Sequence, residues 1–228
     1  MHTADEIYSV VNQSIDKIDW EINPPGLYAP IAYVLALGGK RIRPSLLLMA
    51  SNLFTDNLQA AINPAIAIEI FHNFTLLHDD IMDKAPLRRK QATVHVKWDE
   101  NTAILSGDAM LIKAYEYMAT MPADKLGECL RIFSKTALEV CEGQQYDMDF
   151  EKLETVSQDE YLEMIRLKTA VLLGASLQIG AIIGGANKTD AQLLYDFGIY
   201  IGLAFQLKDD LLDVYADSTK FGKQIGGD

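Results

Sequence analysis

Asp79, Asp80 and Asp83 form an acidic triplet at positions i, i+1 and i+4 of a stretch with helical apolar spacing. Residues four apart lie on one helix face, so the carboxylates of Asp79 and Asp83 are expected to point the same way. Like charges at this spacing cost about 0.2–0.5 kcal/mol on an open helix, and a bound cation removes that cost. Carboxylate oxygens suit a hard ion such as Mg²⁺, Mn²⁺ or Ca²⁺, and Mg²⁺ is usually held by one or two carboxylates together with substrate phosphates.

A second triplet with the same spacing, Asp209, Asp210 and Asp213, ends another apolar helical run. One triplet alone is as consistent with a solvated helix face as with a site. Two copies, each in a helix too apolar to be wholly exposed, favour a site. If the two helices face each other, they line a cavity with six carboxylates, which predicts a seat for several divalent ions and an anion.

Basic residues gather near these stretches. The segment 38–44, Gly-Gly-Lys-Arg-Ile-Arg-Pro, places cations where a helix is expected to begin. A helix N-terminus already attracts anions, so added cations indicate an anion-binding turn, although solvated surface charges remain an alternative. Arg88 and Arg89 follow Asp83 so closely that they must lie beside the first triplet, either as salt bridges to it or as forks for phosphate oxygens.

Three further groups belong to the candidate site. Lys168, followed by Thr169, lies in an apolar helix where an unpaired lysine is costly. Gln206 and Lys208 precede the second triplet, and His72 lies about two turns before the first. For His72 both a structural and a ligand-binding role remain open, whereas His78 has the wrong helical angle to share a metal with the triplet.

The chain as a whole is expected to be all-α: a single domain over residues 1–228, with eight to ten helices bundled around a central cavity. Helices are expected at about 7–18, 27–37, 44–53, 63–83, 99–121, 123–149, 157–183 and from 189 onward, with capping boxes at Ser157 and Thr189. A polar loop is expected over 84–93, and no confident strand is indicated.

Composition excludes several functions. The net charge of −12 argues against binding nucleic acid or anionic lipid. The longest uncharged run, Ala170–Ala186, is shorter than the ~20 residues that span a bilayer, so it is expected to be a buried helix. Cys129 and Cys141 are expected to be buried reduced thiols of a cytoplasmic protein.

Acidic pairs and phosphate-binding cations among apolar helices suggest a diphosphate on an apolar tail. The motifs GGKRIRP (38–44), LLHDDIMD (76–83) with Arg88-Arg89, Lys168-Thr169, FQLKDDLLD (205–213) and Gly222-Lys223 closely resemble those of the trans-isoprenyl diphosphate synthases, the polyprenyl synthetase family. The likeness is strongest to short-chain geranylgeranyl and farnesyl diphosphate synthases. The family normally continues for several more helices after the Gly222-Lys223 loop, so this chain is expected to lack them, and Lys90 follows the arginine pair where the family usually has glycine.

The resemblance implies an isoprenoid synthase fold, a homodimer, and an Mg²⁺-dependent condensation of isopentenyl diphosphate with an allylic diphosphate, using two or three ions, with Mn²⁺ as a substitute. It places the metals on Asp79, Asp83 and Asp209, supported by Asp80, Asp210 and Asp213. It assigns the allylic diphosphate to Arg88, Lys168, Lys208 and Lys223, and isopentenyl diphosphate to Lys40, Arg43, His72 and Arg89. Lys168, Thr169 and Gln206 are implied to shelter the allylic cation.

Product length follows from the residues one turn before Asp79. A helical turn rises ~5.4 Å, close to one extended isoprene unit. Phe74 is bulky and Thr75 is small, which by the family's pattern favours a C20 product over C15, with Phe71 closing the pocket further along. Plain core packing of Phe74 is the alternative.

Three other functions fit the sequence less well. A class I terpene cyclase shares the metals but not the isopentenyl site, so the cluster at 38–44 counts against it. A non-catalytic subunit tends to lose a triplet, and a helical metal-buffering protein has no use for Lys168 in an apolar helix.

Overall fold

The structure, a computed structural model, describes residues 1–215, with side chains up to residue 212. The elements are α1 (Ala4–Asp16), α2 (Pro25–Ala36), α3 (Ile42–Asn52), α4 (Gln59–Met82), β1 (Leu87–Arg88), β2 (Gln91–Ala92), α5 (Val94–Lys97), α6 (Glu100–Met118), α7 (Ala123–Phe150), α8 (Gln158–Ile165), the π-helical turn η1 (Arg166–Ala170), α9 (Val171–Gly184) and α10 (Lys188–Tyr215). The predicted all-α architecture is confirmed. Three elements were not predicted: a two-stranded hairpin in the 84–93 loop, the short helix α5, and the π-helical turn η1 within the helix expected at 157–183.

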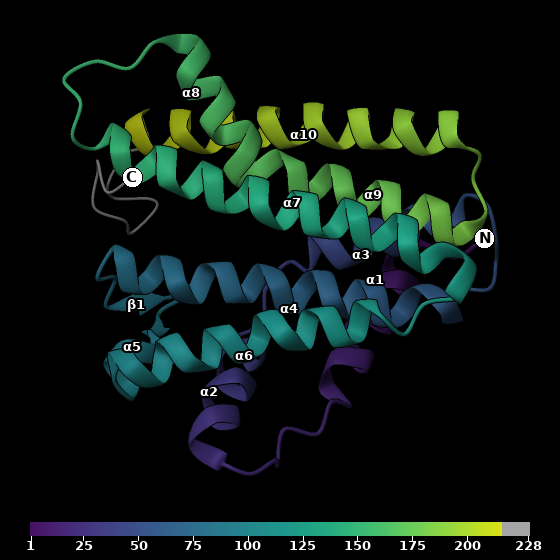
Figure 1. The fold of residues 1–228 in the computed structure, drawn as a ribbon, viewed down its shortest axis with the longest axis horizontal. Helices are drawn as coiled ribbons and strands as arrows, with labels where there is room; N and C mark the ends of the chain where they lie inside the picture. Colours follow the sequence, from purple (N-terminus) through teal and green to yellow (C-terminus); the bar gives the residue numbers. More distant parts are fainter. Residues whose placement is uncertain (216–228) are drawn as a thin grey trace.

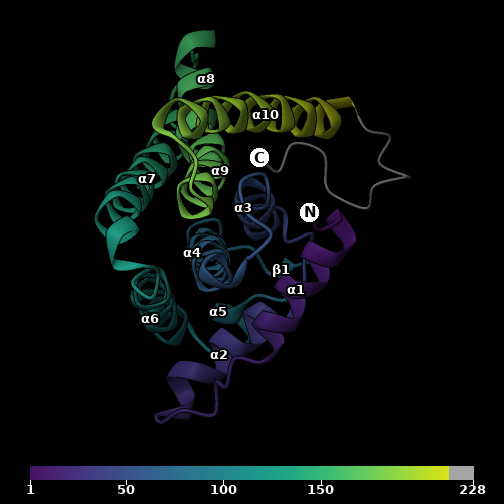
Figure 2. The same ribbon diagram turned by 90° about the vertical axis from the view of Figure 1, so that its right-hand side faces the viewer.

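The helices form a bundle with α3, α4 and α9 at its centre (Figure 2). Helix α4 packs against α3 and α6, α3 packs against α9, and α9 packs against α7 and α10. Side chains such as Phe71, Ile68, Leu47 and Phe133 are fully buried between these helices. Apolar burial of this extent is the main stabilising contribution to such a bundle.

The C-terminal ends of α4 and α10 lie at the same end of the molecule (Figure 1). The two acidic triplets occupy these helix ends in the sequence. The bundle therefore places two segments that are far apart along the chain at one end of the molecule, and the predicted facing of their carboxylates stays a prediction.

Several predicted helix starts differ from the structure. Helices α1, α2 and α3 begin two or three residues earlier than predicted, and α4 begins at Gln59 rather than near residue 63, with Pro64 inside the helix. Helix α10 is capped by Asn187, whose side-chain oxygen accepts a hydrogen bond of 2.9 Å from the backbone N–H of Asp190. Asparagine is as favourable an N-cap as threonine, so the helix is capped at Asn187, two residues before the predicted cap at Thr189. The capping box at Ser157 is confirmed.

Two helical stretches, Gln59–Met82 and Gln158–Gly184, are long and apolar enough to cross a membrane by length and composition alone. However, 67% and 72% of their most apolar windows are buried inside the bundle, as expected for core helices. The predicted buried helix at 170–186 is α9. Cys129 is buried as predicted, but Cys141 is exposed, because it faces outward from α7; both are free thiols.

Candidate active site

The first acidic triplet lies at the C-terminal end of α4, where Asp80 is buried and Asp83 ends the helix. Arg88, on β1, donates from Nε to Asp80 Oδ1 at 2.8 Å and from Nη2 to Asp79 Oδ2 at 3.2 Å. The salt-bridge alternative for Arg88 therefore holds in this structure. Because a guanidinium has five N–H donors, the same arginine could exchange a carboxylate for a phosphate oxygen.

Lys168 approaches the triplet from η1. Its Nζ lies 3.6 Å from Asp79 Oδ1 and 2.6 Å from Asp147 Oδ2 on α7. These carboxylates raise the pKa of Lys168 even though burial lowers it. Lys168, for which an apolar helix would be unfavourable without a partner, is thus paired with both Asp79 and Asp147. It therefore stays charged beside the first triplet.

The triplet retains unsatisfied negative charge. Asp79 Oδ1 is buried without a hydrogen-bond partner among the described residues. Burial, followed by the charges of Asp79, Asp147 and Glu151, raises the pKa of Asp83 to about 6 against the pull of Lys168. Among the side chains that the structure describes, no three His, Cys, Asp or Glu groups form a ready-made metal site. A crowded carboxylate group with an orphaned oxygen nevertheless fits a hard divalent ion.

The raised pKa of Asp83 predicts a pH dependence. Its folded pKa of about 6 lies above the ordinary value of 3.8, so the metal-free folded state binds more protons than the unfolded state between these two values. The contribution of Asp83 to stability is therefore fully present below about pH 4 and is lost as pH rises through about 6. Asp83→Asn is expected to flatten this slope in chemical denaturation of the metal-free protein at pH 4.5 to 7.5. An unchanged slope in this variant would contradict the assignment.

The π-turn η1 connects the two triplets. Thr169, next to Lys168, donates from Oγ1 to Gln206 Oε1 at 3.1 Å, and Gln206 Nε2 donates to Asp210 Oδ1 at 2.7 Å. Tyr161 on α8 also donates to Asp210. A π-turn interrupts the regular helix and is frequent at functional sites. Here it presents Lys168 to the first triplet and Thr169 to the helix of the second.

The remaining predicted ligands lie further from this contact. Lys208 and Asp209 are exposed on α10. The side chain of Asp213 and the whole of Lys223 fall outside the described residues. Two surface hollows, of about 670 and 270 Å³, lie elsewhere among the described residues, near Trp20 and near Glu139. A cavity enclosed by six carboxylates thus stays a prediction.

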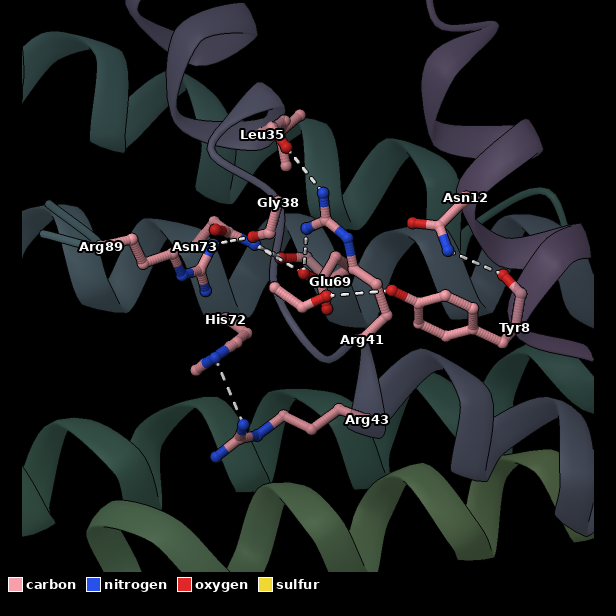
Figure 3. A network of polar contacts seen from close by, with 11 residues as sticks. Tyr8, Asn12, Leu35, Gly38, Arg41, Arg43, Glu69, His72, Asn73 and Arg89 are labelled. Carbon is pink, nitrogen blue, oxygen red and sulfur yellow. Dashed lines mark hydrogen bonds and ion pairs between the residues drawn. The ribbon is translucent and has the colours of Figure 1, made fainter. Parts of the chain in front are cut away.

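A separate basic cluster forms where α3 begins (Figure 3). Arg43 Nη1 donates to His72 Nε2 at 3.2 Å, while Arg89 donates to the carbonyl of Gly38. Lys40 is exposed beside them. Burial and the nearby guanidiniums, above all that of Arg43, hold the pKa of His72 well below its usual range, so it is a neutral acceptor. The structure therefore brings Arg43, His72 and Arg89 together.

The hairpin directs its two arginines to different places. Residues 89 and 90 form a two-residue loop between β1 and β2, both with positive φ, 53° and 66°. Such loops are usually built from asparagine and glycine. Arg88 contacts the acidic triplet, and Arg89 lies against Gly39, where a Cβ would come within 2.9 Å of its guanidinium. The close approach of Arg89 thus requires a glycine.

Lys90→Gly is expected to stabilise the protein by up to about 1 kcal/mol. A left-handed backbone conformation costs a residue with a side chain about 1–2 kcal/mol, which glycine avoids. Glycine also loses more conformational entropy on folding, and this cancels part of the stabilisation. The measurement is the free energy of unfolding in urea. Arg89→Gly relieves the same strain but also removes the hydrogen bond to the Gly38 carbonyl, so it is expected to stabilise the protein less than Lys90→Gly. A destabilised Lys90→Gly would show that the lysine makes a stabilising contact that outweighs its backbone strain.

Aromatic rings line the inner face of α4 before the triplet. The ring of Phe74 lies 4.8 Å from His78 and 5.6 Å from Phe71, and Phe71 lies 5.3 Å from Phe133 on α7. Thr75 donates to the carbonyl of His72 and lies on a different face. His78 packs at Gly107 of α6, consistent with a structural role. Phe71 and Phe74 are therefore buried in tilted and edge-on contacts, and their place along a product pocket stays a prediction.

Sequence reasoning missed Asp147, Tyr161 and Glu69. Asp147 partners Lys168, Tyr161 partners Asp210, and Glu69 pairs with Arg41. Glu69 could have been found, since it is an acid within the apolar run that precedes the first triplet. The other two carry no distinguishing spacing.

Comparisons with known proteins bear on this site. The family model for polyprenyl synthetase matches residues 24–228. The geranylgeranyl diphosphate synthase of Methanosarcina mazei is 42% identical over all of this chain and 72% of its own length. The geranylfarnesyl diphosphate synthase of Natronomonas pharaonis is 40% identical over all of this chain and 74% of its own length. A crystal structure of a geranylgeranyl pyrophosphate synthase superimposes with a TM-score of 0.94 at 53% identity, over all of this chain and 70% of that one.

The matched region includes both triplets, the basic cluster and the π-turn. Membership of one family therefore accounts for both the fold and the motifs. The chain belongs to the polyprenyl synthetase family, and its chemistry is prenyl transfer by an isoprenyl diphosphate synthase.

Proposed function

We propose that this protein condenses isopentenyl diphosphate with an allylic diphosphate to form geranylgeranyl diphosphate, C20. The observation that carries the proposal is the pair of charged sites on either side of one hairpin. The carboxylates of the first triplet lie on one side, and the cluster of Arg43, His72 and Arg89 lies on the other. Two diphosphates need two such sites, and a cyclase that ionises one substrate does not need the second.

The allylic diphosphate is assigned to Arg88 and Lys168. Both cations already reach carboxylates of the triplet, so each can turn to a diphosphate oxygen with little movement. Lys208 and Lys223 are proposed to join them. As the C–O bond of the allylic substrate breaks, the positive charges of Arg88 and Lys168 stabilise the negative charge that develops on the leaving diphosphate.

The allylic carbocation is proposed to lie near Thr169 and Gln206. Their hydrogen-bonded oxygens, 3.1 Å apart, place negative dipole ends close to Lys168. The π-electrons of isopentenyl diphosphate form the new C–C bond, and a proton then leaves to the departed diphosphate. Lys40, Arg43, His72 and Arg89 would hold the isopentenyl diphosphate, with His72 neutral.

A divalent metal is expected for the family, and Mg²⁺ is proposed here, in two or three ions, with Mn²⁺ as a substitute. Asp79, Asp83 and Asp209 would hold it, supported by Asp80, Asp210 and Asp213. When bound, the ion would neutralise the leaving diphosphate as a Lewis acid. A homodimer in the cytoplasm is proposed on the resemblance to the family.

The proposal is tested by a product assay. Wild-type protein with Mg²⁺, labelled isopentenyl diphosphate and a C5, C10 or C15 allylic partner is expected to give C20. A C15 product would revise the length and leave the reaction intact. A cyclised hydrocarbon, or no incorporation of isopentenyl label, would contradict the condensation.

The product length is expected to increase when Phe74 is replaced by alanine. Removal of its ring opens roughly one isoprene unit of space, because one helical turn of ~5.4 Å separates successive rings along α4. We therefore expect C25 from Phe74→Ala, measured by mass spectrometry, with Phe71 as the new end of the pocket. Thr75→Ala is the matched control and should leave the length unchanged. An unaltered length in Phe74→Ala would show that its ring is only core packing.

A further inference from the structure

Arg41 lies in the basic loop but differs from its neighbours. Only 6% of it is exposed, whereas Lys40 is exposed and Arg43 is half-buried. Its backbone has φ 47° and ψ 35°, the left-handed region that favours glycine. A buried charge in a disfavoured backbone conformation is kept only where its surroundings hold it there.

Two contacts hold the guanidinium of Arg41. Nη1 pairs with Glu69 Oε1 at 2.5 Å, and Nη2 donates to the carbonyl of Leu35 at 2.6 Å, in the last turn of α2. Asn73 Nδ2 donates to the same Glu69 oxygen at 3.0 Å. Arg41 thus ties the end of α2, the loop 38–41 and the middle of α4 to one another (Figure 3).

The groups proposed to bind isopentenyl diphosphate sit on this same frame. Gly38, whose carbonyl accepts from Arg89, lies on one side of Arg41 in the chain, and Arg43 lies on the other. His72 follows Glu69 by one helical turn on α4. Displacement of Arg41 would therefore move both the loop and the approach of Arg89.

Glu69 also balances charge. The cluster crowds several guanidiniums together, and burial lowers the pKa of both Arg43 and Arg89. The carboxylate of Glu69 opposes this shift in both. Without this carboxylate, the cations would repel one another when no anion is bound.

We propose that the Arg41–Glu69 ion pair positions the isopentenyl diphosphate site: it fixes the loop 38–43 on α4 so that Lys40, Arg43, His72 and Arg89 face one anion before it binds. This inference rests on the proposed function. Arg41 and Glu69 touch no substrate in this scheme. They act through the loop and through the charge that they supply.

The test is the double variant Arg41→Met, Glu69→Leu. Removing one partner leaves a buried unpaired charge, whereas replacing both with apolar residues of similar size is often neutral for stability. The two single variants therefore show how much the ion pair matters for folding. The double variant shows how much it matters for the position of the binding groups. The matched control is the more exposed pair Lys113–Glu116 on α6, replaced in the same way.

The double variant is expected to raise KM for isopentenyl diphosphate about tenfold or more, because a misplaced binding group can cost up to about a hundredfold. Its kcat and its KM for the allylic substrate should stay within about twofold of the wild-type values. Arg41→Lys should recover part of the loss. A folded double variant with wild-type KM for isopentenyl diphosphate would overturn the proposal, and so would an equal rise in both KM values.

Calorimetric titration of isopentenyl diphosphate separates this proposal from the proposed function. If wild-type protein binds isopentenyl diphosphate but forms no product, the proposed reaction fails. The positioning role is then judged by whether the double variant binds more weakly than wild type and the control pair. No binding to the wild-type protein overturns both proposals.

Discussion

Asp79→Asn is expected to lower the rate of product formation by about a hundredfold or more, because the loss of one preorganised electrostatic group costs about that much in other enzymes. Within the first triplet, Asp79 is contacted by two cations, Arg88 and Lys168, and its Oδ1 has no hydrogen-bond partner among the described residues. The asparagine keeps the shape of the side chain and removes the charge. The measurement is kcat at saturating substrates and Mg²⁺, with the free energy of unfolding determined alongside.

The matched control is Asp149→Asn. Asp149 is an exposed acid two residues beyond Asp147 on α7, and it pairs only with Lys152 among the described residues. Exposed pairs contribute little, so activity and stability should both stay close to wild type. Equal losses in the two variants would indicate a general charge effect. Retained activity in Asp79→Asn would remove Asp79 from the chemistry.

Gly143→Ala is expected to destabilise the protein by about 1–3 kcal/mol and to impair catalysis. A Cβ at this position would meet the backbone of η1, 2.7 Å from Lys168 Cα. Overpacking against backbone costs about this much because no side chain can rotate away. The displaced backbone is the one that presents Lys168 and Thr169, so kcat should fall as well. Urea denaturation and the product assay measure the two effects.

Gly127→Ala on the same helix is the control. A Cβ there has open space within 4 Å. Alanine is favoured over glycine by about 1 kcal/mol inside a helix, so this variant should be as stable as wild type or more so. If Gly143→Ala behaves like Gly127→Ala, the close contact between α7 and η1 has no energetic consequence.

Local signals predicted most of the elements and only part of the site. Gly38 and Ser157 mark helix ends through their own backbone or side-chain chemistry, and the structure has helix ends there, whereas α3 begins at Ile42, two residues before Pro44. The spacing of Asp79 and Asp83 fixes a shared face before any tertiary contact exists. By contrast, the start of α10 was misjudged because Asn187 and Thr189 are both good caps, and the choice between them is made by packing.

The contacts between helices could not be predicted in the same way. The partners of Lys168 and Asp210, namely Asp147 and Tyr161, come from helices whose relative rotation no local pattern specifies. The π-turn lies directly against Gly143 of α7, and this contact is a tertiary property. Arg41 and Arg43 are two residues apart and equally basic, yet one is buried against Glu69 and the other faces His72.

The tight hairpin loop at residues 89 and 90 has a consequence for communication between the substrates. Arg88 and Arg89 are neighbours in the chain, one bonded to the acidic triplet and the other to the Gly38 carbonyl. A two-residue loop leaves no slack between them. Because both arginines belong to this tight hairpin, a movement of its backbone on one side is transmitted to the other side, so the loop couples the two subsites. Its length is therefore a constraint on the chain: an inserted residue would uncouple the two sites even if both arginines were retained.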